Sequence, residues 1–236
     1  MSENLMVSLR GKFRAMTGLV CLLGVMGLGL FVSSCCDDDT VGPANVIKCL
    51  VKTDFAVSMA PFTDTHGDVS LQGGRLLMVR TGDTEADAYA TFAKSWSAFN
   101  LTGDLSLITT ESRVSVAVQD SGTEIGYHVV LQNETQNGSQ AGLFLFYNSR
   151  HGNEETPAED VLIQYLFTPA ADHVYAFRLD RSSAGEFALW LDGTAVGTAQ
   201  DTRVTTFGRV WLNAGQDTSA GHGASLGDLT LCRSGV

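Results

Sequence analysis

The sequence predicts an all-β domain, a sandwich or barrel of Greek-key type, over residues 46–236. Short runs in which apolar and polar residues alternate recur throughout this region, and clusters of Gly, Asn, Asp and Ser separate them. No long segment places its apolar residues at helical spacing. Many short strands at this spacing are typical of β-sandwiches and barrels.

The expected strands follow one another along the chain. They are Arg113–Gln119, Ile125–Gln132, Gly142–Asn148, Val161–Phe167, His173–Asp180, Phe187–Asp192 and Arg209–Asn213. In Ile125–Gln132 the apolar side chains at 125, 127, 129 and 131 share one face, and His128 and Gln132 lie on the other. We therefore expect the first face to pack in the core and the second to be more exposed to water. Gly142–Asn148 is apolar on both faces, which indicates a central or doubly covered strand. Asn137-Gly138 predicts a hairpin between these two strands, and the only helical turn expected lies near Pro157–Val161.

Residues 1–34 have the layout of a signal peptide, with three basic residues at positions 10–14 before an apolar run at 16–31. The following Val-Ser-Ser-Cys, at 32–35, resembles the lipobox of bacterial lipoproteins, whose cysteine takes a diacylglycerol and becomes the new N-terminus. The resemblance implies lipidation of Cys35 and a place in the bacterial cell envelope outside the cytoplasm. An uncleaved anchor is the alternative, because about 18 to 20 apolar residues span a bilayer.

Residues 35–45 are the expected lipidated tether. Cys36 and three aspartates follow the lipidation site, and this acidic run resembles the export tags of surface-displayed lipoproteins in some Gram-negative bacteria. A solvated tether explains the same residues equally well. We therefore expect attachment to the outer membrane through the lipid, with surface display left open.

The acidic charge of the chain excludes several partners. The whole sequence carries a net charge of -11, and because the leader contributes a net +2 the mature part is near -13. Phosphate backbones and anionic headgroups repel such a domain. We expect no nucleic-acid partner, and no membrane attachment through a basic patch.

The segment His173–Asp180, followed by Gly185–Gly197, resembles the signature hairpin of concanavalin A-like lectin/glucanase domains, including laminin G-like modules. Asp192-Gly193 supplies the turn of that hairpin, with Gly193 free to take a positive φ. Leu226–Cys232 fits the last strand, which in these folds pairs near the first. The resemblance implies a two-sheet antiparallel jelly roll and, by analogy, carbohydrate or protein binding.

No catalytic or metal site is predicted. Laminarinase-type relatives carry Glu-x-Asp-x-x-Glu, because retaining hydrolysis needs two carboxylates about 5 Å apart. Here Glu85-Ala86-Asp87 is the nearest match and Ala90 stands in place of the last acid. The oxygens of Asp64–Asp68 are suited to Ca²⁺, but the repeated ligand spacing of a calcium loop is missing. We therefore expect no enzyme and no cofactor, and we interpret Asp64–Asp68 as a polar turn.

Cys49 and Cys232 lie near the two ends of the predicted domain. In an oxidising compartment this placement favours a disulfide that clasps the first strand to the last. Two isolated buried thiols are the alternative.

Two tryptophans are the candidate ligand-binding residues. Strand alternation turns Trp190 away from the apolar face of its strand, and it turns Arg209, Trp211 and Asn213 outward in theirs. We expect one aromatic platform, flanked by Arg178, on which sugar rings stack. The alternative is that loops or the tether bury both indoles, since most tryptophans are largely buried.

These observations predict a lipid-anchored extracytoplasmic module that binds glycan. The alternative is a structural or protein-interaction domain of a cell-surface complex, with the same fold and no glycan.

Overall fold

The computed structural model describes residues 48–82, 84–133, 140–148, 159–215 and 220–233. Within these ranges the chain forms β-strands and no helix. One sheet of nine strands contains β1 (Cys49–Lys52), β3 (Asp68–Gln72), β4 (Arg75–Val79), β6 (Phe99–Leu107), β11 (Tyr175–Arg181), β12 (Glu186–Leu191), β13 (Thr194–Gln200), β15 (Gly223–Leu226) and β16 (Thr230–Arg233). A second sheet of seven contains β2 (Asp64–His66), β5 (Ala86–Trp96), β7 (Arg113–Gln119), β8 (Gly126–Gln132), β9 (Gly142–Asn148), β10 (Glu159–Leu166) and β14 (Phe207–Ala214).

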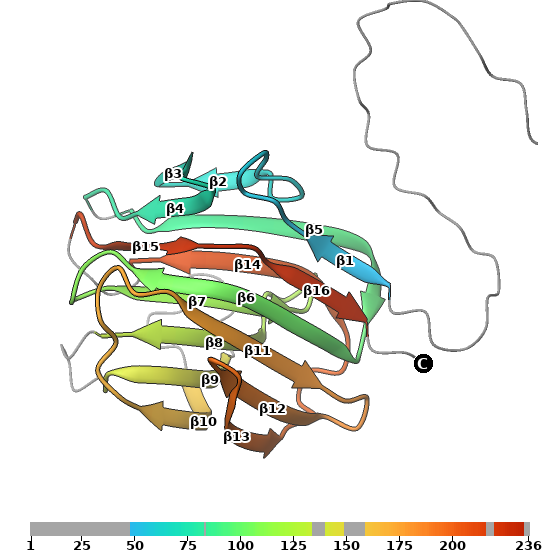
Figure 1. Ribbon diagram of the computed structural model, residues 1–236. Helices are drawn as coiled ribbons and strands as arrows, with labels where there is room; N and C mark the ends of the chain where they lie inside the picture. Colours follow the sequence, from blue (N-terminus) through green and yellow to red (C-terminus); the bar gives the residue numbers. More distant parts are fainter. Residues whose placement is uncertain (1–47, 83, 134–139, 149–158, 216–219, 234–236) are drawn as a thin grey trace, which may run out of the picture. The chain divides into compact units, whose positions relative to one another are not determined.

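The two sheets lie face to face, one in front of the other in Figure 1. The nine-stranded sheet has the order β13-β12-β11-β6-β15-β4-β3, and β16 pairs with both β6 and β1 beside this path. The seven-stranded sheet has the order β10-β9-β8-β7-β14-β5-β2. The named strands pair antiparallel, as in the β11 and β6 pair and the β14 and β7 pair. The predicted two-sheet antiparallel sandwich is therefore confirmed.

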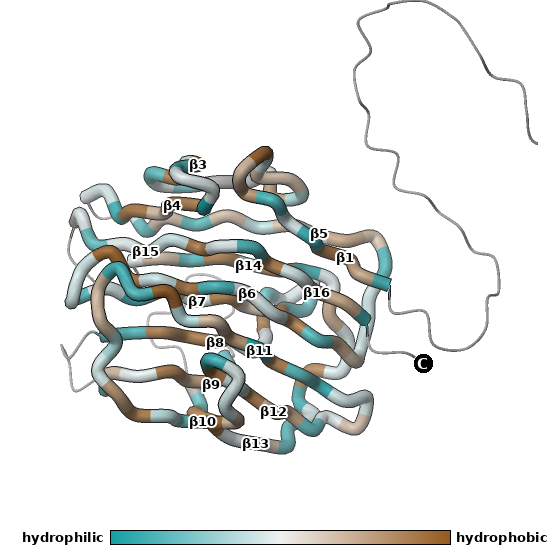
Figure 2. The backbone as a smooth tube through the Cα atoms, viewed as in Figure 1, coloured by the Kyte–Doolittle hydropathy of each residue, from teal (hydrophilic) through white to brown (hydrophobic). Residues whose placement is uncertain are grey.

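The core lies between the sheets and follows the alternation of the sequence. Apolar and polar residues alternate along many strands in Figure 2, and the residues buried between the sheets occupy every second position. Leu105 on β6 and Leu189 on β12 come from one sheet, and Val116 on β7 and Leu212 on β14 come from the other. The remaining side chains of each strand point to the outer face of its sheet, but on β8 and β9 these are buried too, and Val130, Phe144 and Phe146 form a second apolar cluster there.

The expected strands are present, with two differences. We expected a helical turn near Pro157–Val161, but β10 already begins at Glu159 and Val161 pairs with Phe146 of β9; positions 157 and 158 lie outside the described residues. A proline is a local turn signal, and pairing with β9 determines the conformation after it. The last expected strand, Leu226–Cys232, divides into β15 and β16, which both pair antiparallel with β6; the register shifts by one residue between Leu226 and Thr230.

The predicted hairpin between β8 and β9 is confirmed by its register, in which Gln132 pairs with Gly142; its turn, Asn137-Gly138, lies outside the described residues. Gly142–Asn148 is buried on both faces, as its apolar composition predicts. The segment Asp64–Asp68 forms β2, a turn at Gly67 with φ of 69°, and the start of β3. No group of three metal-ligating side chains occurs in the described ranges.

The first and last strands of the domain are covalently joined. β1 pairs with β16, and a disulfide links Cys49 to Cys232 at the start of that pair. The leader, Cys35 and the tether all fall within residues 1–47, outside the described residues, and remain predictions. None of the segments described here is a helix with the length and hydropathy needed to cross a bilayer.

Candidate ligand-binding surfaces

The two tryptophans lie on different sheets. Trp190 belongs to β12 of the nine-stranded sheet, and Trp211 belongs to β14 of the seven-stranded sheet. Each points away from the core of its own sheet, as the alternation predicts, so the two outward directions are opposite. The prediction that both tryptophans form one aromatic platform is therefore wrong. Arg209 and Asn213 lie on the same strand and face as Trp211, whereas Arg178 lies beside Trp190 on the other sheet.

The first surface, called the Trp211 surface, is the outer face of β5 and β14. In the register of these strands Trp211 pairs with Tyr89, and Asn213 pairs with Asp87. Both aromatic side chains are partly exposed. Tyr89 was not among the expected site residues, although the sequence carries a signal for it: alanines at 86, 88 and 90 alternate with Asp87 and Tyr89. The three alanines are buried, so Tyr89 points outward.

Polar groups surround the two rings of the Trp211 surface. The guanidinium of Arg209 lies 4.0 Å from the centroid of the Tyr89 ring and forms an ion pair with Glu124. Asn213 donates a hydrogen bond from Nδ2 to Oε2 of Glu85 at 2.8 Å. His66 Nδ1 and Asp87 Oδ1 are 3.0 Å apart. Both acids of the incomplete glucanase motif are thus engaged with neighbouring side chains of this face.

The expectation that His128 lies on a wetter face is wrong: it is 2% exposed, because its face of the sheet is covered as well, and it packs against the Trp211 ring. Across the sheet Trp211 pairs with Ala117 and Ala117 pairs with His128, so the small alanine leaves room for the two rings to meet edge to face, 5.6 Å apart. Burial, and secondarily the charge of Arg113, lowers the pKa of His128 to about 3. His128 is therefore neutral at neutral pH, and it positions the indole without adding charge to the surface.

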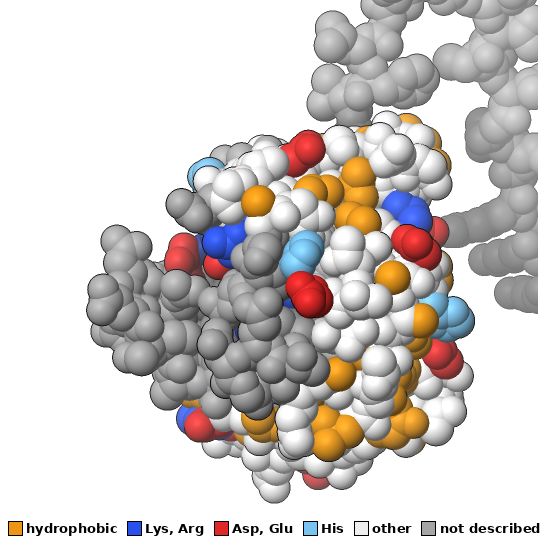
Figure 3. All heavy atoms as spheres, turned by 90° about the vertical axis from the view of Figure 1, so that its left-hand side faces the viewer, with side chains coloured by type: hydrophobic (Ala, Val, Ile, Leu, Met, Phe, Trp, Pro, Cys, Tyr) orange, Lys and Arg blue, Asp and Glu red, His pale blue; other side chains and the backbone are white. Residues whose placement is uncertain are grey.

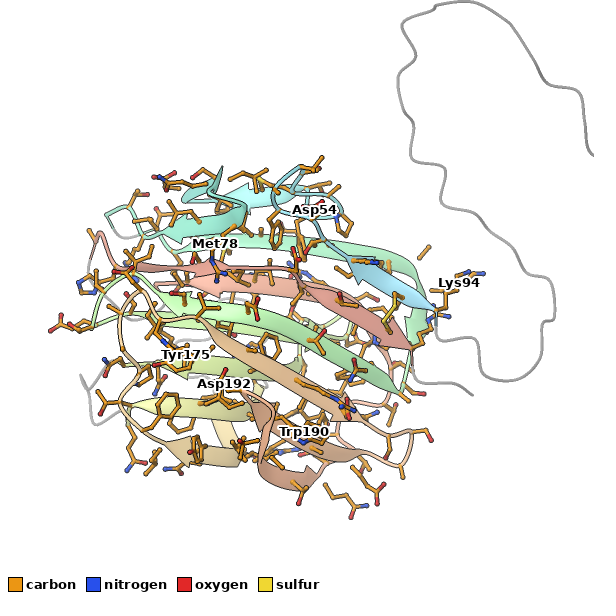
Figure 4. The ribbon with its side chains drawn as sticks, viewed as in Figure 1. Asp54, Met78, Lys94, Tyr175, Trp190 and Asp192 are labelled. Atoms are coloured by element: carbon orange, nitrogen blue, oxygen red, sulfur yellow. A yellow bond between two sulfur atoms is a disulfide. The ribbon has the colours of Figure 1, made fainter. Side chains whose placement is uncertain are left out.

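The second surface, called the Trp190 surface, is the outer face of β11, β12 and β13, at the lower front of the sandwich in Figure 4. Trp190 pairs with Arg178 across the strands, and the guanidinium stacks 4.6 Å from the indole centroid. Arg178 donates two hydrogen bonds to the carboxylate of Asp180, which also accepts one from Asn100. Hydrogen bonding to Asp180 raises the pKa of Arg178, so the guanidinium stays protonated and positively charged.

The turn between β12 and β13 positions one end of the Trp190 surface. Asp192 and Gly193 both have positive φ, 48° and 77°, and they form the two-residue turn that the sequence predicts. The Asp192 carboxylate accepts a hydrogen bond from the backbone N–H of Ala176 at 2.9 Å. A hollow of about 200 Å³ lies between this turn and the indole.

Several exposed apolar side chains lie on or near the edge strand β10. Val161, Tyr165 and Leu166 of β10 and Val174 before β11 are 41 to 51% exposed. Figure 3 shows hydrophobic side chains in the lower part of the end of the sandwich that it faces. Such residues favour contact with another protein over contact with a sugar hydroxyl.

No protein-family model matches the sequence, and no curated protein matches it. Solved structures with this fold do match. The carbohydrate-binding module CBM66 from Bacillus subtilis aligns over 71% of this chain and 93% of its own, with 15% identity and a TM-score of 0.50. The Emp47p carbohydrate recognition domain aligns over 73% and 88%, with 13% identity and a TM-score of 0.55.

An enzyme shares the same architecture. The kappa-carrageenase from Pseudoalteromonas carrageenovora aligns over 85% of this chain and all of its own, with 10% identity and a TM-score of 0.58. At these identities the likeness is one of fold, and it agrees with the two-sheet antiparallel jelly roll expected for this chain.

Proposed function

We propose that this chain is a lipid-anchored, extracytoplasmic module that binds glycan and carries out no catalysis. The fold it shares with carbohydrate-binding domains supports the ligand class. The sequence of the leader, residues 1–34, supports the lipid anchor and the place outside the cytoplasm.

The observation that carries the proposal is the pairing of Tyr89 with Trp211 on one outer face. Neighbouring aromatic rings offer an apolar surface for the C–H face of a sugar ring, while their edges stay polar. Hydrogen-bonding groups around such a surface fix the orientation of a ligand. Arg209, Asn213 and Asp87 supply donors and acceptors here, and each is already held in place by another side chain.

Replacing Trp211 with alanine should weaken retention by soluble polysaccharides in affinity electrophoresis by about tenfold or more, the effect of losing roughly 1.4 kcal/mol of stacking. Tyr89→Ala should act in the same direction, because its ring lies beside the indole. Tyr165→Ala removes an exposed aromatic from a different part of the chain and is the matched control. The melting temperature of each variant is measured as well, so that a loss of binding can be distinguished from a loss of folding. Equal retention of Trp211→Ala and wild type would count against this surface.

Cys35→Ala is expected to leave an unprocessed precursor without lipid, because the thiol of Cys35 is the group in the leader placed to take a diacylglycerol. Metabolic labelling with a fatty acid, followed by electrophoresis, measures both effects. Cys36→Ala is the control and should keep its label. A labelled Cys35→Ala protein would overturn the anchor assignment.

The apolar residues of β10 favour a second candidate, a structural or protein-interaction domain. Val161, Tyr165 and Leu166 would then form the contact, and the chain would need no glycan. A glycan array distinguishes the two candidates: binding to no glycan, with a surface-protein partner lost on Leu166→Asp, would favour the second.

A further inference from the structure

We propose that the Trp190 surface is a second, independent glycan contact, so that one module holds two glycan chains on opposite faces. The proposal rests on the glycan-binding function given above and extends it. The residues that form this surface come from the nine-stranded sheet, whereas those of the Trp211 surface come from the other sheet.

Small residues open the space around the Trp190 indole. Trp190 pairs with Ala195 on β13, and two residues earlier on β12 Ala188 pairs with Asp180. Because neither alanine reaches out from the sheet, the indole borders the hollow of about 200 Å³ at the Asp192-Gly193 turn. A further hollow of about 660 Å³ lies along the same strands, and its polar lining includes Asp180, Ser182, Glu186, Thr198 and Gln200.

The two hollows share no lining residue, but they lie along the same strands of one face, and an extended ligand that follows both would occupy a line that we call the track. Outward positions 186, 188 and 190 of β12 span roughly 13 Å at the usual rise of a strand. One end of the track is aromatic, at Trp190, and the other is lined by hydroxyl, amide and carboxylate groups. This combination suits a chain of sugar units, in which one ring stacks and its neighbours form hydrogen bonds.

Arg178, Asp180 and Asn100 give this surface its hydrogen-bonding chemistry. A guanidinium carries five N–H donors, and Arg178 uses two of them on Asp180, so three remain among the described residues for ligand oxygens. The Asp180 carboxylate can accept from sugar hydroxyls in addition to Arg178 and Asn100. Because Asp180 holds the guanidinium in a fixed plane on the indole, the donors are oriented before the ligand arrives.

The charges of the track select uncharged sugars. The positive charge of Arg178 is offset by Asp180, with which it forms an ion pair. Glu186 adds a further negative charge at the other end of the track. Sulfate or carboxylate groups on a glycan would therefore meet net repulsion, and neutral polysaccharides are the expected class.

The placement of the two surfaces has a mechanical consequence. Packed sheets lie about 10 Å apart, and their outer faces point in opposite directions. A glycan strand on one face cannot lie along the other at the same time, so each module can join two strands. Binding of both to one polymer network raises the apparent affinity beyond that of either surface.

The test uses the full chain, purified in a non-ionic detergent at one copy per micelle. Affinity electrophoresis with dextran, mannan, laminarin and xylan as neutral probes, and carrageenan as the charged probe, identifies a retaining polysaccharide. Titration calorimetry with a short oligosaccharide of that polymer then counts the sites. We expect two sites per chain in the wild type and one in Trp190→Ala and in Trp211→Ala. Retention should disappear only in the double variant. Arg178→Ala, which keeps the indole, provides a second variant should Trp190→Ala fail to fold, and it should weaken the same site.

The outcomes separate this inference from the proposed function. One site in the wild type, already lost in Trp211→Ala, would overturn the second contact and leave the glycan-binding function standing. Unchanged titration of Trp190→Ala and Arg178→Ala would do the same. Retention by carrageenan alone would overturn the neutral-sugar assignment. No retention by any probe would contradict the proposed function itself.

Discussion

Arg181→Ala is expected to lower the free energy of unfolding by about 3 to 5 kcal/mol, because it removes a buried, hydrogen-bonded side chain that packs among aromatic rings. Arg181 is 2% exposed and lies at the inner face of β11, within 5.0 Å of the centroid of the Phe207 ring. It donates hydrogen bonds to the backbone carbonyls of Ser97 and Val204. Alanine would leave the buried carbonyl of Val204 unpaired, at a cost of roughly 1 to 3 kcal/mol, would remove the hydrogen bond to Ser97, and would open a cavity among aromatic rings.

Arg178→Ala is the matched control, because Arg178 lies on the same strand with its side chain 52% exposed. An exposed ion pair contributes about 0 to 1 kcal/mol, so this variant should unfold at nearly the wild-type denaturant concentration. Urea denaturation followed by tryptophan fluorescence measures both variants. Equal stabilities of Arg181→Ala and Arg178→Ala would show that the buried guanidinium contributes no more than the exposed one.

Cys49→Ser should destabilise the domain by about 2 to 4 kcal/mol, because the bond closes a very long loop and restricts the unfolded chain. The two cysteines are 183 residues apart in the sequence. For a domain of this size the loss corresponds to a melting temperature lower by about 5 to 15 °C. The difference should appear in non-reducing buffer only.

Wild-type protein treated with a reductant is the internal control, and it should melt with Cys49→Ser. Alkylation of the unfolded wild type without reductant tests the bond itself. Two alkylated thiols at Cys49 and Cys232 in protein made in the periplasm would contradict the clasp and its contribution to stability.

Much of the fold could be predicted from local patterns. The alternation in Arg209–Asn213 correctly predicts that Trp211 points outward. The Asp192-Gly193 turn can be predicted from its two residues, because the conformation of such a turn depends on few neighbours. Arg181 escaped prediction, since a charged residue at the end of an alternating strand reads as exposed. Only the packing of Phe207 and Phe187 around it, from two other strands, shows that it is buried.

The sequence by itself determined which residues of each strand face the core, because strand periodicity is a local property of the backbone. For the same reason it predicted an all-β domain, with a sandwich and a barrel both open. Only the tertiary structure decided which sheet each strand joins, since that choice depends on pairing between segments far apart in the chain. This choice placed Tyr89 beside Trp211, 122 residues later in the sequence, and sent Trp190 to the opposite face. The two candidate surfaces are therefore a product of sheet assembly.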